Sequence, residues 1–302
     1  MKTAEKSISS VPAFDVRDAL AAAIARLETA GTPSAALAAE LLLMHTLGCD
    51  RTWLYAYPEY QVSARQAAAY AALIEQRAAC VPTQYLTGRQ EFWGMDFEVG
   101  PGVLIPRPET EHIIEVALAR LASRRTEPLT IADVGTGSGC IAVVLAHELP
   151  GARIVATDIS PTALEFARRN AERHGVSERV VFRQMNLLDG YLSNVAEQSC
   201  FDVIVSNPPY VGRSEAADLP REVREHEPPE ALFAGECGLD AYPPLIAQAA
   251  KLIRPRGWLL VELGYSSADP VRALVAAQRG WRDVILTNDL AGIPRVLAAE
   301  RT

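Results

Sequence analysis

The stretch Leu129–Cys140, which runs LTIADVGTGSGC, decides the fold that we predict for this chain. An apolar run, three spaced glycines and a second apolar segment indicate a strand that turns through a glycine loop into a helix. Glycine lets the backbone approach a ligand closely, and the start of a helix offers unpaired N–H donors. Cys140 stands where a dinucleotide-binding loop has its third glycine, and the Gly-Lys-Ser/Thr of a phosphate-binding loop is absent. Phosphate is therefore not the obvious ligand.

An alternation of short apolar runs and helical segments continues from this loop towards the C-terminus. Such a pattern predicts an α/β domain whose mainly parallel sheet is covered on both faces. Ligands of such sheets bind beyond the carboxyl ends of the strands, where the polar motifs of this chain fall. The expected strands are Leu129–Val134, Arg153–Thr157, Val180–Arg183, Phe201–Ser206, Trp258–Leu263 and Val284–Thr287.

Asp158 closes the second expected strand, nineteen residues after Gly139. A carboxylate at that place can accept hydrogen bonds from both ribose hydroxyls of a nucleoside. Strand, glycine loop, helix, strand and terminal acid together predict a nucleoside-containing cofactor. Ser160 and Pro161 are expected to start the next helix.

The segment Asn207-Pro208-Pro209-Tyr210 follows the fourth expected strand. Two prolines stiffen the backbone, so the Asn207 carboxamide and the Pro208 carbonyl are presented in fixed directions. These two acceptors can bind both N–H hydrogens of an amide or aromatic amine and turn its nitrogen lone pair towards an incoming methyl group. Tyr210 can pack on the planar group. A sulfonium methyl as electrophile requires neither a metal nor a covalent intermediate. The alternative to substrate binding is a purely structural role, in which the two prolines only end the strand.

The N-terminal part, from about residue 12 to 80, is rich in Ala and Leu at helical spacing and predicts a small helical bundle. Asp15 is expected to cap a helix that runs to Gly31, and Ser63 with Gln66 forms a capping-box pattern for a helix that ends near Cys80. A helix between them follows Ser34 and ends at Gly48, with Leu37, Leu41 and Met44 on one side.

Aromatic, glycine and alternating residues from Pro82 to Gly100 predict a β-hairpin that bridges two domains. The segment Ile105–Glu111 then leads into a helix, with Pro108, Glu109 and Glu111 where a first turn tolerates them. Helix-start stabilisation is at least as good an interpretation of these acids as catalysis. Residues 213–230 predict a solvated loop or, second, a lid.

Composition restricts the partners. The chain has 302 residues and 29 basic against 37 acidic side chains, a net charge of −8. A protein that binds nucleic acid usually carries a basic excess, so such a substrate is unlikely. The five cysteines are scattered and the histidines are isolated, so we expect no metal site. The segment Met1–Ser10 is polar and no long apolar run occurs, so we expect neither a signal peptide nor a membrane helix. These expectations together predict a cytoplasmic protein.

At this point the sequence resembles the release factor glutamine methyltransferases called HemK or PrmC, within the class I S-adenosylmethionine-dependent methyltransferases. The Asn-Pro-Pro-Tyr segment is shared with adenine-methylating enzymes, whereas the hairpin and Pro-Arg-Pro-Glu-Thr-Glu segments are more specific. The resemblance rests on the glycine loop together with Pro82–Gly88, Glu91–Gly94, Leu104–Glu111, Ser206–Tyr210, Glu227-Pro228 with Ala231-Leu232, and Asp289–Gly292.

The resemblance implies a Rossmann-like sheet, a helical recognition domain at residues 1–81, a hairpin linker at 82–104 and a methyltransferase domain at 105–302. It further implies that S-adenosylmethionine is converted to S-adenosylhomocysteine and that the glutamine of a Gly-Gly-Gln tripeptide in a peptide chain release factor is methylated. Asn207, Pro208, Pro209 and Tyr210 would hold that glutamine, with Asn207, Pro208 and Tyr210 as the catalytic set. The implied cofactor-binding residues are Gly135, Thr136, Gly137, Ser138, Gly139, Asp158, Asn186, Leu187 and Asn207.

This chain departs from the family pattern in places. The loop after the third strand commonly has Asp-Trp where this chain has Asn186-Leu187, so stacking area for an adenine is smaller. Ser267 replaces a Gln and Cys237 an Asp. Two other functions stay open: methylation of a ribosomal-protein glutamine or of adenine in nucleic acid, and non-catalytic cofactor binding by a protein that docks a translation factor. Glu262 either lines the site or is a buried structural carboxylate.

Overall fold

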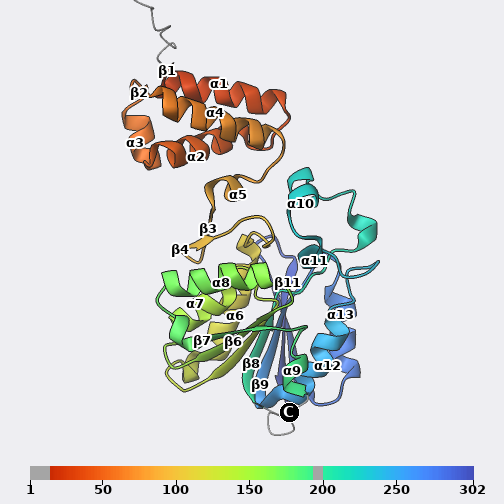
Figure 1. Cartoon of the computed structure of the whole chain (residues 1–302). Helices are drawn as coiled ribbons and strands as arrows, with labels where there is room; N and C mark the ends of the chain where they lie inside the picture. The colour runs from red at the N-terminus through yellow and green to blue at the C-terminus, as the bar shows by residue number, and fades with distance from the viewer. Residues whose placement is uncertain (1–13, 193–199) are drawn as a thin grey trace, which may run out of the picture. The chain divides into compact units, whose positions relative to one another are not determined.

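The computed structural model describes residues 14–192 and 200–302, and Figure 1 shows its elements. The chain divides into two compact units, Met1–Gly88 and Arg89–Thr302. The polar segment Met1–Ser10, for which we predicted no signal peptide, lies outside the described residues. None of the helices in the described ranges has the length and apolar character that crossing a membrane requires.

The N-terminal unit is a small helical bundle, as predicted. Asp15 accepts a hydrogen bond from the Asp18 N–H at the start of its first helix, and Ser63 with Gln66 forms the expected capping box. Gly48 ends the second helix in the left-handed conformation at φ 68°. Its elements are β1 (Phe14–Asp15), α1 (Val16–Thr29), α2 (Ala35–Leu47), α3 (Arg51–Ala56), β2 (Gln61–Val62), α4 (Ala64–Ala78) and α5 (Thr83–Thr87).

The face of α2 that packs into the bundle is not the one that carries Leu37, Leu41 and Met44. Leu37 is 45% exposed, and the other two are only half-buried. Helices α1 and α4 contact α2 on a neighbouring side, where alanines allow a close approach. The buried residues of α2 are Ala35, Ala38, Ala39, Leu42 and Leu43.

The predicted β-hairpin is shorter than its sequence pattern suggested. Residues 83–87 form α5, which ends at Gly88, and only then do β3 (Arg89–Phe92) and β4 (Met95–Glu98) pair. Pro82 precedes the helix and Leu86 packs on the bundle core, so tertiary packing overrides the aromatic pattern there. Trp93 and Gly94 form the turn with φ 58° and 69°, as a two-residue hairpin loop requires.

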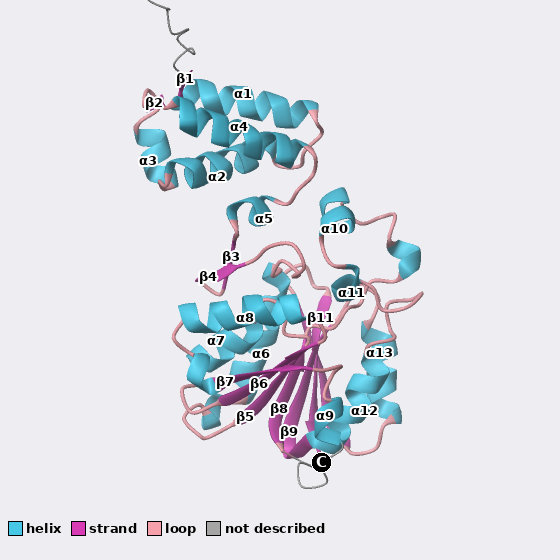
Figure 2. Cartoon of the chain, in the orientation of Figure 1, coloured by secondary structure: helices cyan, strands magenta, loops and turns pink. Residues whose placement is uncertain are grey.

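The second unit is built on a seven-stranded sheet in the order β10-β11-β9-β8-β5-β6-β7. Strands β5 to β9 are parallel where they pair, and all six predicted strands are present. Figure 2 shows the strands as one sheet between two groups of helices. The strands are β5 (Thr130–Val134), β6 (Arg153–Asp158), β7 (Val180–Gln184), β8 (Phe201–Ser206), β9 (Ile253–Glu262), β10 (Trp281–Asn288) and β11 (Pro294–Arg301).

The sequence prediction missed β11, which pairs antiparallel with both β9 and β10. It begins with a proline and ends in charged residues, so its apolar run is only four residues long. In the fold, the five residues Val296–Glu300 pair with β9, four of them fully buried. A reversed strand inserted between two others is a tertiary outcome that the local pattern does not indicate.

Two hydrophobic cores cover the two faces of this sheet (Figure 1). One lies under α6 (Glu111–Arg120), α7 (Cys140–Glu148) and α8 (Pro161–Arg173), and it includes Phe92 and Phe97 of the hairpin. The other lies under α12 (Tyr242–Leu252) and α13 (Ala268–Ala277). The remaining helical turns are η1 (Pro108–Thr110), η2 (Ala122–Arg124), η3 (Ser177–Arg179), α9 (Asp189–Leu192), η5 (Arg213–Glu215), α10 (Arg221–His226) and α11 (Pro229–Leu232).

Candidate active site

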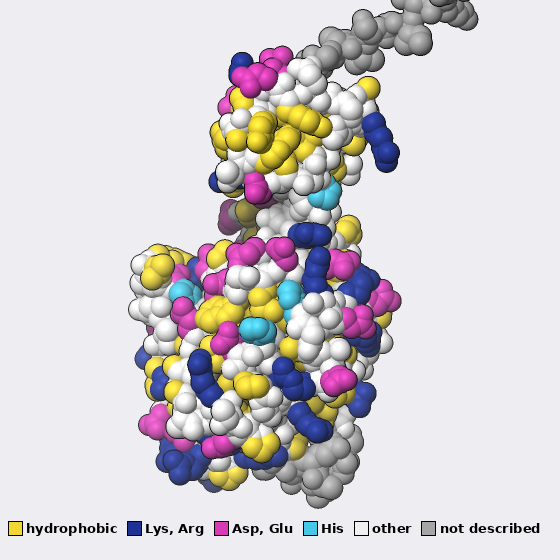
Figure 3. All heavy atoms as spheres, turned by 90° about the vertical axis from the view of Figure 1, so that its left-hand side faces the viewer, with side chains coloured by type: hydrophobic (Ala, Val, Ile, Leu, Met, Phe, Trp, Pro, Cys, Tyr) yellow, Lys and Arg dark blue, Asp and Glu magenta, His cyan; other side chains and the backbone are white. Residues whose placement is uncertain are grey.

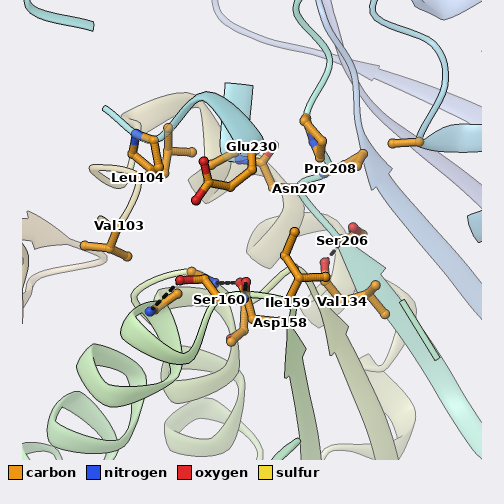
Figure 4. A pocket seen from close by; sticks show the side chains of 18 of the residues that line it. Val103, Leu104, Val134, Asp158, Ile159, Ser160, Ser206, Asn207, Pro208 and Glu230 are labelled. Atoms are coloured by element: carbon orange, nitrogen blue, oxygen red, sulfur yellow. Dashed lines mark hydrogen bonds between the residues drawn. The ribbon is translucent and has the colours of Figure 1, made fainter. Parts of the chain in front are cut away.

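A cavity of about 400 Å³ opens at the carboxyl ends of β5, β6 and β8, where the predicted motifs meet. Asp158 and Ile159 lie on one side of it, and Asn207, Pro208 and Glu230 lie on the other (Figure 4). Ten of the twelve site residues predicted from the sequence line this cavity, and Gly139 and Tyr210 do not. Those that line the cavity are Gly135, Thr136, Gly137, Ser138, Asp158, Asn186, Leu187, Asn207, Pro208 and Pro209.

The glycine loop has the backbone that its sequence predicts. Gly135, Gly137 and Gly139 have φ values of 73°, 56° and 82°, a region that side chains other than glycine avoid. A Cβ on Gly135 would lie 4.0 Å from the Asn207 carbonyl oxygen, so a side chain there would enter the space between the loop and the Asn207 segment. Gly135 and Gly137, which line the cavity, thus keep its floor open.

Gly139 has a different task, because it does not line the cavity. A Cβ there would come within 3.0 Å of both Cα and Cβ of Ala167 on α8. Its lack of a side chain lets α7 and α8 pack closely behind the loop.

Asp133, the last but one residue of β5, anchors the glycine loop from below. Its Oδ2 accepts hydrogen bonds from Thr136 Oγ1 at 2.6 Å and from the Ala142 N–H at 3.1 Å. Burial raises the pKa of this carboxyl to about 7, and the two hydrogen bonds limit that rise. The sequence analysis quoted Asp133 without giving it a role. Its position two residues before Gly135 is the signal that could have indicated it.

Asp158 ends β6 and faces the cavity with a carboxylate that is already partly used. Oδ2 accepts from the Gly137 N–H and Oδ1 from the Ser160 N–H, both at 2.9 Å. Each oxygen keeps a second acceptor site, so two ligand hydroxyls can still be bound. Burial raises the pKa of Asp158, and the charge of Glu230 across the cavity adds to the rise.

Asn207 presents its side chain at the cavity wall beside η1. Its Nδ2 donates to Thr110 Oγ1 at 3.0 Å, which ties the Asn-Pro-Pro-Tyr segment to the Pro-Arg-Pro-Glu-Thr-Glu segment. Thr110 is 2% exposed and also lines the cavity. The sequence analysis missed Thr110, although it lies within a segment that carried the resemblance.

Tyr210 does not line the cavity. Its hydroxyl donates to Glu262 Oε1 at 3.2 Å behind the cavity wall, and burial raises the tyrosine's pKa above its ordinary range. Glu262, at the end of β9, is 1% exposed, and burial raises its pKa to about 7. The carboxylate is therefore buried behind the site, one of the two positions that the sequence left open for it.

The loop after β7 supplies Asn186 and Leu187 to the cavity. Asn186 Nδ2 donates to Asp189 Oδ2 at 3.3 Å, so its carbonyl oxygen is free to accept from a ligand. Leu187 has a φ of 49° and packs partly on the second hydrophobic core. A leucine held in this way supplies a flat apolar wall of limited area.

Part of the segment between β8 and α12 borders the cavity, and the interpretation of residues 213–230 as a lid stays a prediction. Pro228, Glu230 and Ala231 line it. Glu227 is buried, bonds the Arg107 guanidinium, and accepts from the Ile105 N–H at 3.3 Å. These contacts hold the segment that precedes η1 against the segment that follows β8.

Over residues 14–192 and 200–302, no three His, Cys, Asp or Glu residues come together in a way that could hold a metal ion. None of the cysteines Cys49, Cys80, Cys140, Cys200 and Cys237 forms a disulfide bond within the described part of the chain.

Comparison with known proteins identifies the fold and the family. A family model described as the PrmC N-terminal domain matches residues 18–88, and one described as a methyltransferase domain matches residues 126–282. Among solved structures, the hMettl16 catalytic domain in complex with MAT2A 3′UTR hairpin 6 aligns with a TM-score of 0.54 at 20% identity, covering 74% of this chain and 80% of that one. At this identity the likeness shows the fold alone.

The sheet order, the glycine loop and the methyltransferase match define a Rossmann-like, class I S-adenosylmethionine-dependent methyltransferase. The release factor glutamine methyltransferase of Koribacter versatilis is 47% identical over 286 residues, 95% of this chain and 98% of that protein. That of Geobacter sulfurreducens is 42% identical over 267 residues, 88% of this chain and 90% of that protein. This chain belongs to the family of release factor glutamine methyltransferases, as the sequence motifs predicted.

Proposed function

We propose that this chain transfers a methyl group from S-adenosylmethionine to the side-chain amide nitrogen of a glutamine in a peptide chain release factor. The observation that carries the proposal is the shared cavity. The glycine loop and Asp158 line one part of it, and Asn207, followed by two prolines, lines another. A nucleoside-binding half and an amide-binding half therefore face the same space (Figure 4).

The cofactor half fits S-adenosylmethionine. Gly135 and Gly137 leave room for its methionine part, and Asp158 has acceptor sites left for the ribose hydroxyls. Asn186 and Leu187 stand where an adenine would lie, with one carbonyl acceptor and one apolar side chain. The bound cofactor supplies an electrophilic sulfonium methyl group.

The substrate half suits a primary amide, whose nitrogen is a poor nucleophile because its lone pair is delocalised. Asn207 Oδ1 and the Pro208 carbonyl accept one N–H each and hold the nitrogen with its lone pair directed at the methyl group. Pro209 stiffens this wall, while Tyr210 supports it from behind through Glu262. Alignment supplies most of the rate, and the amide proton leaves to solvent once the nitrogen is tetrahedral.

A protein substrate suits the surface better than a nucleic acid does. The chain carries a net charge of −8, and the face in Figure 3 shows acidic and basic side chains mixed over the second unit. Three tyrosines of the N-terminal unit are solvent-exposed: Tyr55 is 62% exposed, Tyr57 54% and Tyr60 43%. We propose that this unit, a compact domain that precedes the hairpin, helps to dock the release factor through these exposed aromatic side chains. We propose that the reaction takes place in the cytoplasm.

Mass spectrometry of the substrate tests the proposal directly. The full chain is incubated with S-adenosylmethionine and full-length release factor, and peptides that contain Gly-Gly-Gln are analysed for one added methyl on glutamine. DNA, ribosomal RNA and ribosomal proteins are offered in parallel with labelled cofactor. We expect label in the release factor alone. Preferred labelling of nucleic acid or a ribosomal protein would replace the proposed substrate, and tight release-factor binding without any methyl transfer would indicate a non-catalytic docking protein.

A further inference from the structure

We infer that Thr110 is a positioning residue that sets which end of the Asn207 carboxamide faces the substrate, an inference that rests on the proposed function. The amide has an oxygen and an NH₂ group of similar size, and only the oxygen can accept from a substrate amide. The wall of the site must therefore distinguish these two orientations. Thr110 Oγ1 accepts from Asn207 Nδ2 at 3.0 Å, which leaves Oδ1 for the substrate.

The hydroxyl of Thr110 is not used to cap the helix that follows it, so its oxygen is available to Asn207. Thr110 occupies the N-cap of α6, where a threonine oxygen commonly accepts from the first turn. Here the side chain makes no capping hydrogen bond. Its backbone N–H instead bonds the Arg107 carbonyl at 3.0 Å, which holds the residue in η1.

Glu262 determines the direction of the hydrogen bond between Thr110 and Asn207. A hydroxyl has one hydrogen, and the buried Glu262 carboxyl faces the hydroxyls of both Thr110 and Tyr210. A buried carboxylate is costly without donors, and a hydrogen bond to a charged acceptor is stronger than one to a neutral amide oxygen. The Thr110 hydrogen therefore goes to Glu262, and the oxygen of Thr110 is left to accept from the Asn207 NH₂ group.

These groups come from three separate parts of the second unit. Thr110 lies in η1, Asn207 and Tyr210 follow β8, and Glu262 ends β9. The Arg107–Glu227 ion pair fixes the segment that leads into η1. The charged and titratable groups that face Glu262 are Tyr210, Tyr242, Arg295, Glu109 and Cys140.

The first test compares Thr110→Val, Thr110→Ser and wild type with release factor at pH 8. Valine keeps the shape but loses the hydroxyl, so kcat should fall roughly 10- to 100-fold, while the Kd for S-adenosylmethionine stays within a few-fold. Serine keeps the hydroxyl and should restore kcat. Thr157→Val is the matched control, because Thr157 is fully buried and its hydroxyl makes no hydrogen bond. Normal kcat in Thr110→Val, failed rescue by serine, or equal losses of kcat and cofactor affinity would each overturn the inference.

The second test needs no substrate and separates this inference from the proposed function. Asparagine occurs at only five positions, so ¹⁵N-asparagine labelling gives few side-chain amide signals, and Asn207→Asp identifies the relevant pair. We expect the side-chain amide hydrogens of Asn207 to exchange slowly in wild type and in Thr110→Ser. In Thr110→Val this protection from exchange should be lost. An Asn207 signal unaffected by Thr110→Val would contradict the inference. Absence of methylation by the wild-type chain would instead contradict the proposed function.

Discussion

At the scale of single residues, the site depends on a few polar groups whose partners are already engaged inside the protein. Asp158 accepts from the Gly137 N–H of the glycine loop and from the Ser160 N–H that follows β6, and it still faces the cavity. Asn207 is oriented by Thr110. Because cofactor and nucleophile are held by different residues, substitutions should separate binding from catalysis.

Replacing Asn207 with Ala should abolish methyl transfer while leaving cofactor binding largely intact. The side chain acts mainly on the substrate amide, so kcat should fall roughly 100-fold or more. Steady-state kinetics with release factor measure the loss, and calorimetric titration with S-adenosylmethionine provides the control. Near-normal turnover in this variant would show that the amide nitrogen is aligned by other groups.

Replacing Asp158 with Ala should instead weaken cofactor binding. The lost acceptor for ribose hydroxyls is a charged one, for which about 1.5–3 kcal/mol corresponds to a roughly 10- to 100-fold higher Kd. Calorimetry measures this directly. Asp158→Asn keeps the shape and one acceptor oxygen, so its Kd for the cofactor should lie between those of wild type and Asp158→Ala. An unchanged Kd in Asp158→Ala would remove this residue from the ribose site.

At the scale of elements, glycine does more than open the cavity. Gly139 lies between α7 and α8 at φ 82°, with the backbone of Ala167 in contact range of any added Cβ. Gly175, after α8, has a similar φ of 67° but open space around it. Comparing substitutions at Gly139 and Gly175 therefore separates the free-energy cost of the backbone conformation from that of helix packing.

We expect Gly139→Ala to destabilise the protein more than Gly175→Ala. The left-handed conformation alone costs an alanine roughly 1–2 kcal/mol, and at Gly139 a clash of α7 with α8 adds to it. Urea unfolding of both variants measures the free energies. Equal losses would mean that the two helices move apart at no cost.

The elements also show how far sequence patterns reach. The caps at Asp15 and Ser63 were predicted because each rests on residues three apart in the chain. The sequence pattern did not indicate which face of α2 packs, and it missed the helix α5, because neighbours in the bundle selected the buried side and the local conformation. Strand β11 was missed because its pairing with β9 and β10 is set by the whole sheet.

At the scale of the whole molecule, two buried carboxyl groups make stability depend on pH. Burial raises the pKa of Asp133 and of Glu262 to about 7, above the values of the unfolded chain. The folded state then binds these protons more tightly than the unfolded state. The resulting stabilisation is complete at low pH and is lost as the pH rises through 7.

The free energy of unfolding should therefore fall between pH 5 and pH 8 by virtue of these groups. Glu262→Gln removes one titrating group, so the fall should shrink by at most about 3 kcal/mol, while Asp133 maintains the rest. Chemical denaturation of both proteins at several pH values measures the difference. Identical pH dependence would show that the Glu262 carboxyl has an ordinary pKa in the folded protein.

The sequence by itself determined the parts of this protein that rest on local rules. A glycine loop after an apolar run, an acid at the end of the next strand and two prolines after an asparagine each act through neighbours in the chain, so their fold, cofactor and family were predictable. The tertiary structure alone decided which groups meet across it. Asn207 and Thr110 are 97 residues apart, and Tyr210 and Glu262 are 52 apart. Only packing of η1, β8 and β9 brings these side chains within hydrogen-bond distance, and hydrogen bonds require contact whereas sequence patterns record only spacing.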